Sequence, residues 1–224
     1  MAQNQALANL DNILRVHGKT LCDFPGLPQI DRTQLCFIEN TVLTEETMFN
    51  AVEQLNAALH FEEALNEGQR HAYNKVLQAI QDNKGAVFFL DGPGGSGKTF
   101  LYNALLSRIR GDQKIALACA SSGIAALLLN NGRTAHSRFK IPIDINSEST
   151  CNIKVCSDHA ELLRRATLII WDEAPMTHRH AVEAMDRTLR DIMQKDCLFG
   201  GKIMLFGGDL DKFYQLSIRG VVRM

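Results

Sequence analysis

Residues 88–99 read Phe88-Phe89-Leu90-Asp91-Gly92-Pro93-Gly94-Gly95-Ser96-Gly97-Lys98-Thr99 and fit the pattern G-x-x-x-x-G-K-S/T. An apolar run precedes the pattern and a helix-compatible run follows it, which is the context of a phosphate-binding loop. Glycines let backbone N–H groups approach a phosphate, and the positive end of the next helix points at it. The sequence therefore predicts a nucleoside triphosphate site formed by Gly92, Gly94, Gly95, Ser96, Gly97, Lys98 and Thr99.

Two side chains of this loop have predicted chemical roles. Lys98 would reach the β- and γ-phosphates, and the Thr99 hydroxyl would bind Mg²⁺. We therefore expect ATP and Mg²⁺ as cofactors. The alternative is a glycine-rich strand–helix turn without a ligand.

Composition is that of an ordinary globular protein. The chain has 224 residues, 46% hydrophobic and 22% charged, and no apolar run approaches the roughly 20 residues that a membrane helix needs. The six cysteines form no C-x-x-C pair, which indicates reduced thiols in an intracellular protein. Net charge is −6 over residues 1–64 and +5 over residues 65–224, so the part with the phosphate loop is mildly basic, which permits a nucleic-acid partner without indicating one.

Apolar periodicity divides the chain into a helical preface over residues 1–64 and an alternating strand–helix region over residues 65–224. Two apolar helix faces are predicted in the preface, formed by Leu7, Leu10 and Leu14 and by Met48, Val52, Leu55 and Leu59. Beyond it, strands are predicted over 86–90, 114–120, 167–171 and 202–206, and helices over 69–80, 98–110, 124–129 and 180–193. A polar loop is predicted over 141–160. This order predicts an α/β fold, with a parallel sheet covered by helices on both faces.

An apolar strand over residues 168–171 runs into two carboxylates, Asp172 and Glu173. Ligands bind at the carboxyl edge of open parallel sheets, so both acids are expected beside the phosphate loop. Asp172 would hold the Mg²⁺ shared with Thr99, and Glu173 would deprotonate the attacking water. A water-activating Glu favours a motor-type ATPase over a small-molecule kinase.

A third strand ends in Gly207-Gly208-Asp209, and a polar residue shortly beyond it is expected to sense the γ-phosphate. The candidates are Gln215 and Lys212. We favour Gln215 as the catalytic residue, which places it on a lengthened loop.

These motifs resemble the Pif (petite integration frequency) family of DNA helicases, most closely the branch carried by Helitron transposons. The likeness rests on Leu65-Asn66-Glu67-Gly68-Gln69, the phosphate loop, Ala120-Ser121-Ser122-Gly123-Ile124-Ala125-Ala126, Gly132-Arg133-Thr134-Ala135-His136-Ser137, Trp171-Asp172-Glu173-Ala174-Pro175-Met176 and Phe206-Gly207-Gly208-Asp209. It implies a RecA-like P-loop NTPase domain over residues 65–224, the first motor lobe of a helicase. It also implies that Gln69 reads the adenine base.

The resemblance implies a groove for single-stranded DNA lined by Ser122, Thr134, His136 and Phe139, with Arg138 and Lys140 near phosphates. Hydroxyls, an imidazole, an aromatic face and cations suit a single strand that is bound without base readout. The alternative is that this region packs into the core and His136 is a structural hydrogen-bonding residue. ATP-dependent 5′–3′ translocation, a nuclear location and roles in DNA repair, recombination and telomere maintenance follow from the resemblance alone.

The sequence ends at Met224, soon after the third motif. By the resemblance, we expect that the second motor lobe and its arginine finger are absent and that a partner must supply that arginine. Such arginines contribute on the order of 10³–10⁵ in rate, so slow turnover is expected. Two other hypotheses remain: a transposon-derived fragment that binds nucleotide or DNA without productive hydrolysis, and a different phosphate-loop ATPase or kinase. The oligomeric state is left open, and no membrane partner is expected.

Overall fold

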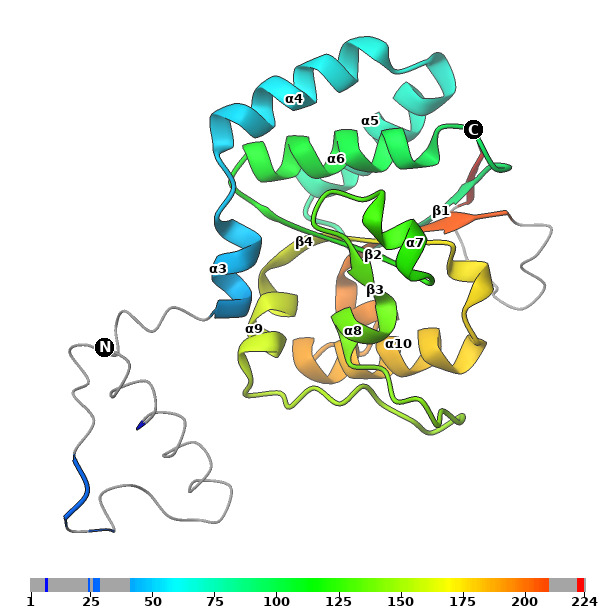
Figure 1. The fold of residues 1–224 in the computed structure, drawn as a ribbon. Helices are drawn as coiled ribbons and strands as arrows, with labels where there is room; N and C mark the ends of the chain where they lie inside the picture. The colour runs from blue at the N-terminus through cyan, green and yellow to red at the C-terminus, as the bar shows by residue number, and fades with distance from the viewer. Residues whose placement is uncertain (1–6, 8–23, 25, 29–40, 210–220, 224) are drawn as a thin grey trace. The chain divides into compact units, whose positions relative to one another are not determined.

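The computed structural model describes residues 41–209 and 221–223, together with Leu7, Phe24 and residues 26–28. The chain divides into two compact units between Thr44 and Glu45, and the second unit contains the sheet (Figure 1). This boundary lies upstream of the predicted division after residue 64, because α4 (Ala51–Ala64) packs along α6 (Lys98–Gly111) within the second unit. The functional division into a preface and a motor lobe stays a prediction.

All paired strands of the described sheet are parallel, in the order β3-β2-β4-β5-β1-β6. Their bounds are Ala86–Asp91 (β1), Ile115–Ala120 (β2), Arg133–Thr134 (β3), Ala166–Asp172 (β4), Ile203–Gly208 (β5) and Val221–Arg223 (β6). Parallel strands require crossover connections, and helices supply several of them here. The predicted α/β class with a parallel sheet is confirmed.

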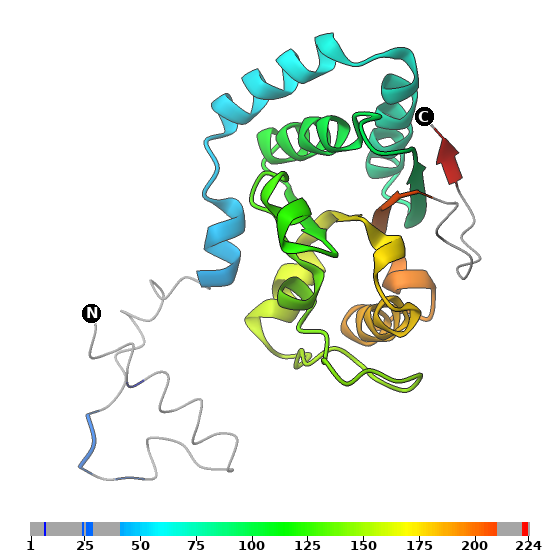
Figure 2. The ribbon, with the colours of Figure 1, turned by 45° about the vertical axis from the view of Figure 1, so that its right-hand side comes forward.

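Helices cover both faces of the sheet (Figures 1 and 2). The α4–α6 layer lies on one side, with α9 and α10 on the other. The other helical segments are α3 (Thr41–Thr47), α5 (Glu67–Gln81), α7 (Gly123–Leu127), α8 (Ala135–Phe139), α9 (Asp158–Arg165), η2 (Ala174–Met176), α10 (Arg179–Met193) and η3 (Leu198–Gly201). No helix in the described part of the chain is long and apolar enough to cross a membrane.

Alternation along the strands builds two hydrophobic layers, because successive side chains of a strand point to opposite faces. Leu90, Ala118 and Ile170 pack with α5 and α6 in one buried cluster. Their neighbours Phe89 and Trp171 are also fully buried, and the Trp171 ring packs against Phe206 with centroids 5.9 Å apart. Both faces of the central strands are therefore inside the protein, as their continuous apolar sequences indicate.

The preface helix over residues 51–64 forms, but its predicted apolar face is mostly exposed. Met48, Val52 and Leu59 are 77%, 66% and 55% exposed, whereas Ala58 is buried. Small side chains allow a close approach here: a Cβ on Gly111 would lie 2.8 Å from the Leu55 side chain. Further differences are the short β3 and α8, which periodicity cannot detect, and α9, which replaces the end of the predicted 141–160 loop because Ser157 caps it.

A buried ion pair joins α8 to the end of α3. Arg138 is 2% exposed and donates from its guanidinium to Glu46, which is also 2% exposed. The same guanidinium donates to the carbonyl oxygens of Asn131 at 2.9 Å and Ala118 at 3.4 Å. The prediction that Arg138 lies near DNA phosphates is therefore wrong, because its charge is neutralised inside the fold.

We predict that Glu46→Gln destabilises the protein by about 3 kcal/mol or more, because it leaves the Arg138 charge buried without its counter-ion. Glu45→Gln is the matched control, since Glu45 pairs with Arg133 on the surface, where an ion pair contributes only about 0–1 kcal/mol. Urea denaturation of both variants measures the difference. Equal losses for the two would contradict the assignment.

Candidate nucleotide site

The phosphate loop connects the end of β1 to the start of α6. Gly97 adopts a left-handed conformation (φ 84°, ψ 21°) at the N-cap of α6, where no side chain caps the helix. This positive φ favours glycine, and a Cβ at Gly97 would also lie 2.4 Å from Nε2 of Gln69 and displace that amide. The first N–H groups of α6 are thus left for an anion, as the phosphate-loop reading requires.

Lys98 and the loop backbone form one hydrogen-bonded unit. The Lys98 side chain is 9% exposed, and its ammonium donates to the carbonyl oxygens of Gly92 at 2.5 Å and Pro93 at 3.0 Å. The Ser96 hydroxyl is buried and has no protein partner, whereas a side chain on Gly94 or Gly95 would meet open space. A buried hydroxyl without a partner beside an open glycine backbone fits a phosphate ligand.

Gln69 links α5 to this loop. Its amide carbonyl accepts from the Asn66 N–H at 3.0 Å, and the Asn66 side chain in turn caps Gln69, so the pair forms a capping box. Its Nε2 donates to the Gly97 carbonyl at 3.3 Å. Gln69 therefore lies beside the phosphate loop, and contact with an adenine base stays a prediction.

Asp172 and Glu173 follow β4 at the carboxyl edge of the sheet. Trp171 pairs with Phe206 of β5, which pairs with Phe89 of β1, so both acids lie at the edge where the loop begins. Asp172 is 5% exposed, and its Oδ1 accepts from the Glu173 N–H at 2.9 Å. The structure thus brings Lys98, Thr99, Asp172 and Glu173 to one edge, as the motifs predict.

Burial raises the pKa of the Asp172 carboxyl above its usual range, and the charge of Glu173 raises it further. The N–H of Glu173 and the Lys98 ammonium lower that pKa, with the smaller net effect. A divalent cation would offset the cost of burying this carboxylate. The hydroxyl of Thr99 and the carboxylate of Asp172 are oxygen donors of the kind that Mg²⁺ prefers, so they fit the metal.

Sequence reasoning missed Tyr102, a fully buried residue of α6 that lies beside Asp172. A Cβ on Gly207 would lie 1.6 Å from the Tyr102 hydroxyl oxygen and 3.2 Å from Oδ1 of Asp172. Burial and the charge of Asp172 raise the pKa of Tyr102 well above its usual value, so its hydroxyl stays protonated. No local pattern in the sequence places Tyr102 beside Asp172. The one sequence signal is the glycine at position 207, which leaves room for the Tyr102 hydroxyl.

Of the residues predicted to contact DNA, some reach the surface and others are buried in the core. His136 and Lys140 are exposed, and Ser122 and Thr134 are half-buried. The hydroxyl oxygens of Ser122 and Thr134 cap α7 and α8, with bonds of 3.2 Å and 3.3 Å. Phe139 is 1% exposed and packs on Trp171 at a centroid distance of 5.7 Å. The prediction that Phe139 lines the groove is therefore wrong, because its ring belongs to the core.

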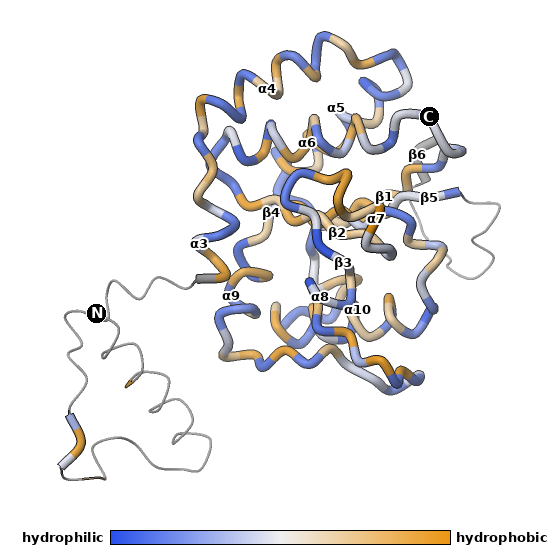
Figure 3. The backbone as a smooth tube through the Cα atoms, viewed as in Figure 1, coloured by the Kyte–Doolittle hydropathy of each residue, from blue (hydrophilic) through white to orange (hydrophobic). Residues whose placement is uncertain are grey.

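Gln215 and Lys212 lie outside the described residues, so the γ-phosphate sensor stays a prediction. Exposed apolar side chains gather next to the predicted DNA segment: Ile124 and Leu127 of α7 are 81% and 84% exposed, and Figure 3 shows this hydrophobic stretch in orange.

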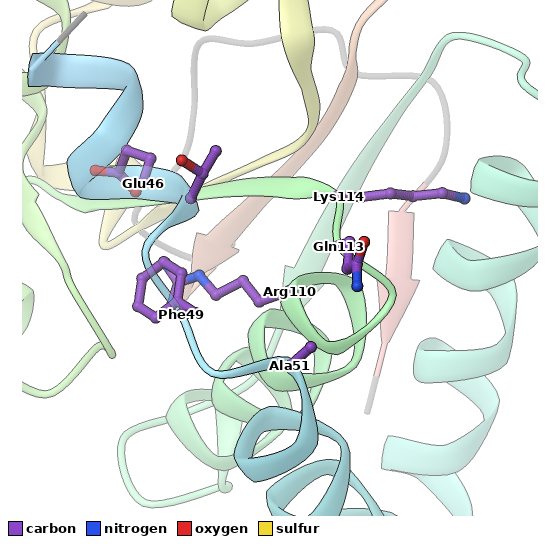
Figure 4. A pocket seen from close by; sticks show the side chains of 7 residues that line it. Glu46, Phe49, Ala51, Arg110, Gln113 and Lys114 are labelled. Carbon is purple, nitrogen blue, oxygen red and sulfur yellow. The ribbon is translucent and has the colours of Figure 1, made fainter. Parts of the chain in front are cut away.

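A cavity of about 400 Å³ lies at the opposite end of α6 from the phosphate loop (Figure 4). Arg110 lines the cavity and stacks on Phe49, with its guanidinium carbon 4.3 Å from the ring centroid. Its guanidinium also donates to the carbonyl oxygens of Asn130 and Ala116. Burial lowers the pKa of Arg110 to about 10, so the side chain stays charged at neutral pH. The cavity is separate from the nucleotide site, and these partners give its arginine a structural role.

A family model described as PIF1-like helicase matches residues 64–220. The chain belongs to the PIF1-like helicase family. Its first-lobe motifs, described above, fall within the matched residues, and the predicted family is confirmed.

Two curated members illustrate the likeness. The ATP-dependent DNA helicase PIF4 of Trypanosoma brucei brucei is 30% identical over 151 residues, covering 65% of this chain and 18% of that protein. The ATP-dependent DNA helicase Pif1 of Psychrobacter sp. is 31% identical over 138 residues, covering 61% of this chain and 21% of that protein. The chain thus spans about a fifth of the length of these relatives.

Solved structures of PIF1-like helicases have the same fold. A crystal structure of Pif1 from Bacteroides in complex with ADP-AlF3 and ssDNA matches with a TM-score of 0.52 and 34% identity, covering 62% of this chain and 32% of that chain. A structure of Bacteroides Pif1 bound to ssDNA matches with a TM-score of 0.53 and 29% identity, covering 69% of this chain and 33% of that chain. The predicted RecA-like domain is confirmed by this agreement.

We predict that Gly207→Ala lowers the stability by about 1–3 kcal/mol and weakens Mg²⁺-dependent nucleotide binding, because the new methyl displaces Tyr102 and Asp172. Gly123→Ala is the control, since a Cβ there meets no atom within 4 Å. Thermal denaturation and titration with a fluorescent nucleotide, with and without Mg²⁺, measure both effects. The packing argument is wrong if Gly207→Ala behaves like Gly123→Ala.

A second prediction separates core packing from DNA contact. Phe139→Leu should cost about 1–3 kcal/mol of stability through lost packing and leave the affinity for single-stranded DNA unchanged. If the ring stacked on a base, its loss would instead weaken binding by about 1–3 kcal/mol, or about 10- to 100-fold. Fluorescence anisotropy with labelled oligothymidine distinguishes the two, with His136→Ala as the accessible comparison.

Proposed function

We propose that this chain forms the ATP-binding lobe of an ATP-dependent DNA helicase, in which ATP hydrolysis moves single-stranded DNA. The observation that carries the proposal is the convergence of two motifs at one sheet edge. Lys98 and Thr99 begin α6, while Asp172 and Glu173 end β4, with only β5 between β1 and β4. Nucleotide hydrolysis needs a phosphate cradle and a base for water, and the loop and Glu173 are the proposed candidates for these two parts.

Binding would be the task of the loop and Gln69. The Lys98 ammonium would exchange its bonds to the Gly92 and Pro93 carbonyl oxygens for the β- and γ-phosphate oxygens. Ser96 would gain a partner for its buried hydroxyl. Gln69, already bonded to Gly97, would contact the adenine base from α5.

Hydrolysis would depend on Glu173. Its backbone N–H donates to Oδ1 of Asp172, which holds the Asp172 carboxylate against the Glu173 backbone. The Glu173 carboxylate would accept a proton from the water that attacks the γ-phosphate. When bound, Mg²⁺ would neutralise charge on the phosphate oxygens, and Thr99 and Asp172 are its proposed ligands.

Single-stranded DNA is the proposed partner, bound along Ser122, Thr134 and His136, with Lys140 near its phosphates. The support is that His136 and Lys140 are exposed, that Ser122 and Thr134 are half-buried rather than buried, and that relatives are described as bound to ssDNA. A second motor lobe or a partner would supply an arginine to the transition state. The 5′–3′ direction, the nuclear location, the Helitron branch and roles in repair, recombination and telomere maintenance are proposed from the family resemblance.

The experiment is steady-state ATP turnover by the 224-residue chain, with and without single-stranded DNA, beside Lys98→Ala and Glu173→Gln. We expect turnover to rise with DNA. Lys98→Ala should abolish nucleotide binding, whereas Glu173→Gln should bind nucleotide normally and turn over on the order of 10²–10⁴ times more slowly.

Nucleotide binding that depends on Lys98, without turnover in the wild-type chain, would instead favour the alternative of a binding protein that does not hydrolyse ATP. Turnover that does not depend on DNA would favour a different phosphate-loop ATPase. Equal behaviour of Glu173→Gln and the wild-type chain would remove Glu173 from the proposed mechanism.

A further inference from the structure

Ser121 stands at the junction of the nucleotide site and the segment proposed to line DNA. It follows β2 directly and precedes Ser122, whose hydroxyl caps α7. Its backbone N–H donates to the Asp172 carbonyl at 3.1 Å, which extends the pairing of β2 with β4 by one step. Ser121 is thus attached by its backbone to the residue before Glu173.

The Ser121 hydroxyl has three close partners, and a fourth, the Asp172 carbonyl oxygen, lies farther away at 3.5 Å. Its Oγ lies 2.6 Å from the Glu173 carbonyl oxygen, 3.1 Å from Nε1 of Trp171 and 2.5 Å from Oγ1 of Thr177. A carbonyl only accepts and an indole N–H only donates, so Ser121 donates to Glu173 and accepts from Trp171. Its remaining lone pair then accepts from Thr177, and every hydrogen-bonding position of the hydroxyl is used.

The Ser121 hydroxyl bonds to the carbonyl of Glu173, a residue with an unusual backbone conformation. Glu173 has φ 52° and ψ 33°, in the left-handed region that residues with a Cβ disfavour. Its N–H is held by Asp172, and its carbonyl accepts from Ser121 and from the Met176 N–H at 3.0 Å. Such a conformation persists only where its surroundings over-determine it, and it is a recurrent feature of functional sites.

The other side of the network reaches α8. Trp171, which donates to Ser121, is fully buried and packs on Phe139 of α8. The same short helix is capped by Thr134 and carries the exposed His136. A continuous set of contacts therefore leads from the proposed DNA segment through Phe139, Trp171 and Ser121 to the Glu173 carbonyl.

We propose that Ser121 is a positioning residue whose hydroxyl holds Glu173 in its left-handed conformation and links the Glu173 carboxylate to the segment that contacts DNA. DNA bound along α7 and α8 would then set the orientation of the base that activates water. This inference rests on the proposed function.

The test compares Ser121→Ala with Ser107→Ala in the full chain. Ser107 is the matched control because it is a buried serine of α6 whose hydroxyl has no partner. We expect Ser121→Ala to lower the DNA-stimulated kcat about tenfold or more, with KM for ATP and nucleotide affinity within about twofold of the wild-type values. Thr177→Val, which leaves the Ser121–Glu173 bond possible, should cause a smaller loss.

Hydrogen exchange of residues 173–177 gives a second readout that needs no turnover. In Ser121→Ala, the Met176 and Thr177 amides, which bond to the carbonyls of Glu173 and Ala174, should exchange about tenfold faster, because the turn opens locally. Ser107→Ala should leave their exchange unchanged.

The two proposals fail differently. A wild-type chain without DNA-stimulated turnover defeats the proposed function, and the exchange measurement then judges the role of Ser121 alone. The inference is overturned if exchange in Ser121→Ala matches that in Ser107→Ala. It is also overturned if kcat, nucleotide affinity and melting temperature fall together, since that pattern indicates a merely structural role.

Discussion

The parallel register of β1, β5 and β4 is the constraint on which the site depends. Phe89, Phe206 and Trp171 form one row across these strands. Each of these three strands therefore ends at the same edge of the sheet, one or two residues beyond that row. The phosphate loop and the acidic pair begin at this edge. A slip of one residue would move every side chain of β4 to the opposite face, and Asp172 would no longer face α6.

Strand β5 lies between the strand that carries the phosphate loop and the strand that carries the acidic pair. It leaves room for their side chains and adds no reactive group of its own. Its end is a pair of glycines, and the first leaves room for the Tyr102 hydroxyl against the Asp172 carboxylate. At the second, Gly208, a Cβ would lie 2.4 Å from Pro175, which follows the acidic pair. The glycine pair thus lets α6 and the β4 turn approach each other across an intervening strand. In the sequence, Gly207-Gly208 indicates a loop. In the fold, the two glycines are needed for packing, because side chains there would clash.

Buried charges in this lobe are of two kinds, and their partners distinguish them. Arg138 and Arg110 have partners within the protein: Glu46 and carbonyl oxygens for the first, carbonyl oxygens and an aromatic face for the second. Burial shifts the pKa of Arg110 downward and that of Asp172 upward, so the shift alone does not distinguish them. Asp172 differs in its neighbours, because the Glu173 N–H and the Lys98 ammonium beside it both come from the sequence motifs of the candidate nucleotide site.

The sequence predicted the features that depend on the local spacing of residues. It did not predict which side chains are buried by packing between elements. The phosphate loop and the acidic pair could be located because their residues are adjacent in the chain and their flanking strands are strongly apolar. Phe139 and Arg138 were misassigned because five-residue helices carry no periodicity that tells a buried face from an exposed one. The exposure of the apolar face of α4 has a related cause. Helix α4 contacts α6 where Gly111 allows a close approach, and its larger apolar side chains mostly remain outside.

The Arg138–Glu46 pair also indicates where the shortest segment that folds by itself must begin. The family match begins at residue 64, yet the counter-ion of Arg138 comes from residue 46, and α4 covers α6 from residues 51–64. A segment cut at the family boundary would keep every nucleotide motif and lose both the counter-ion and the helix that shields α6. Residues 45–64 are therefore part of the folding unit of the RecA-like domain, although they contribute none of the residues of the candidate nucleotide site.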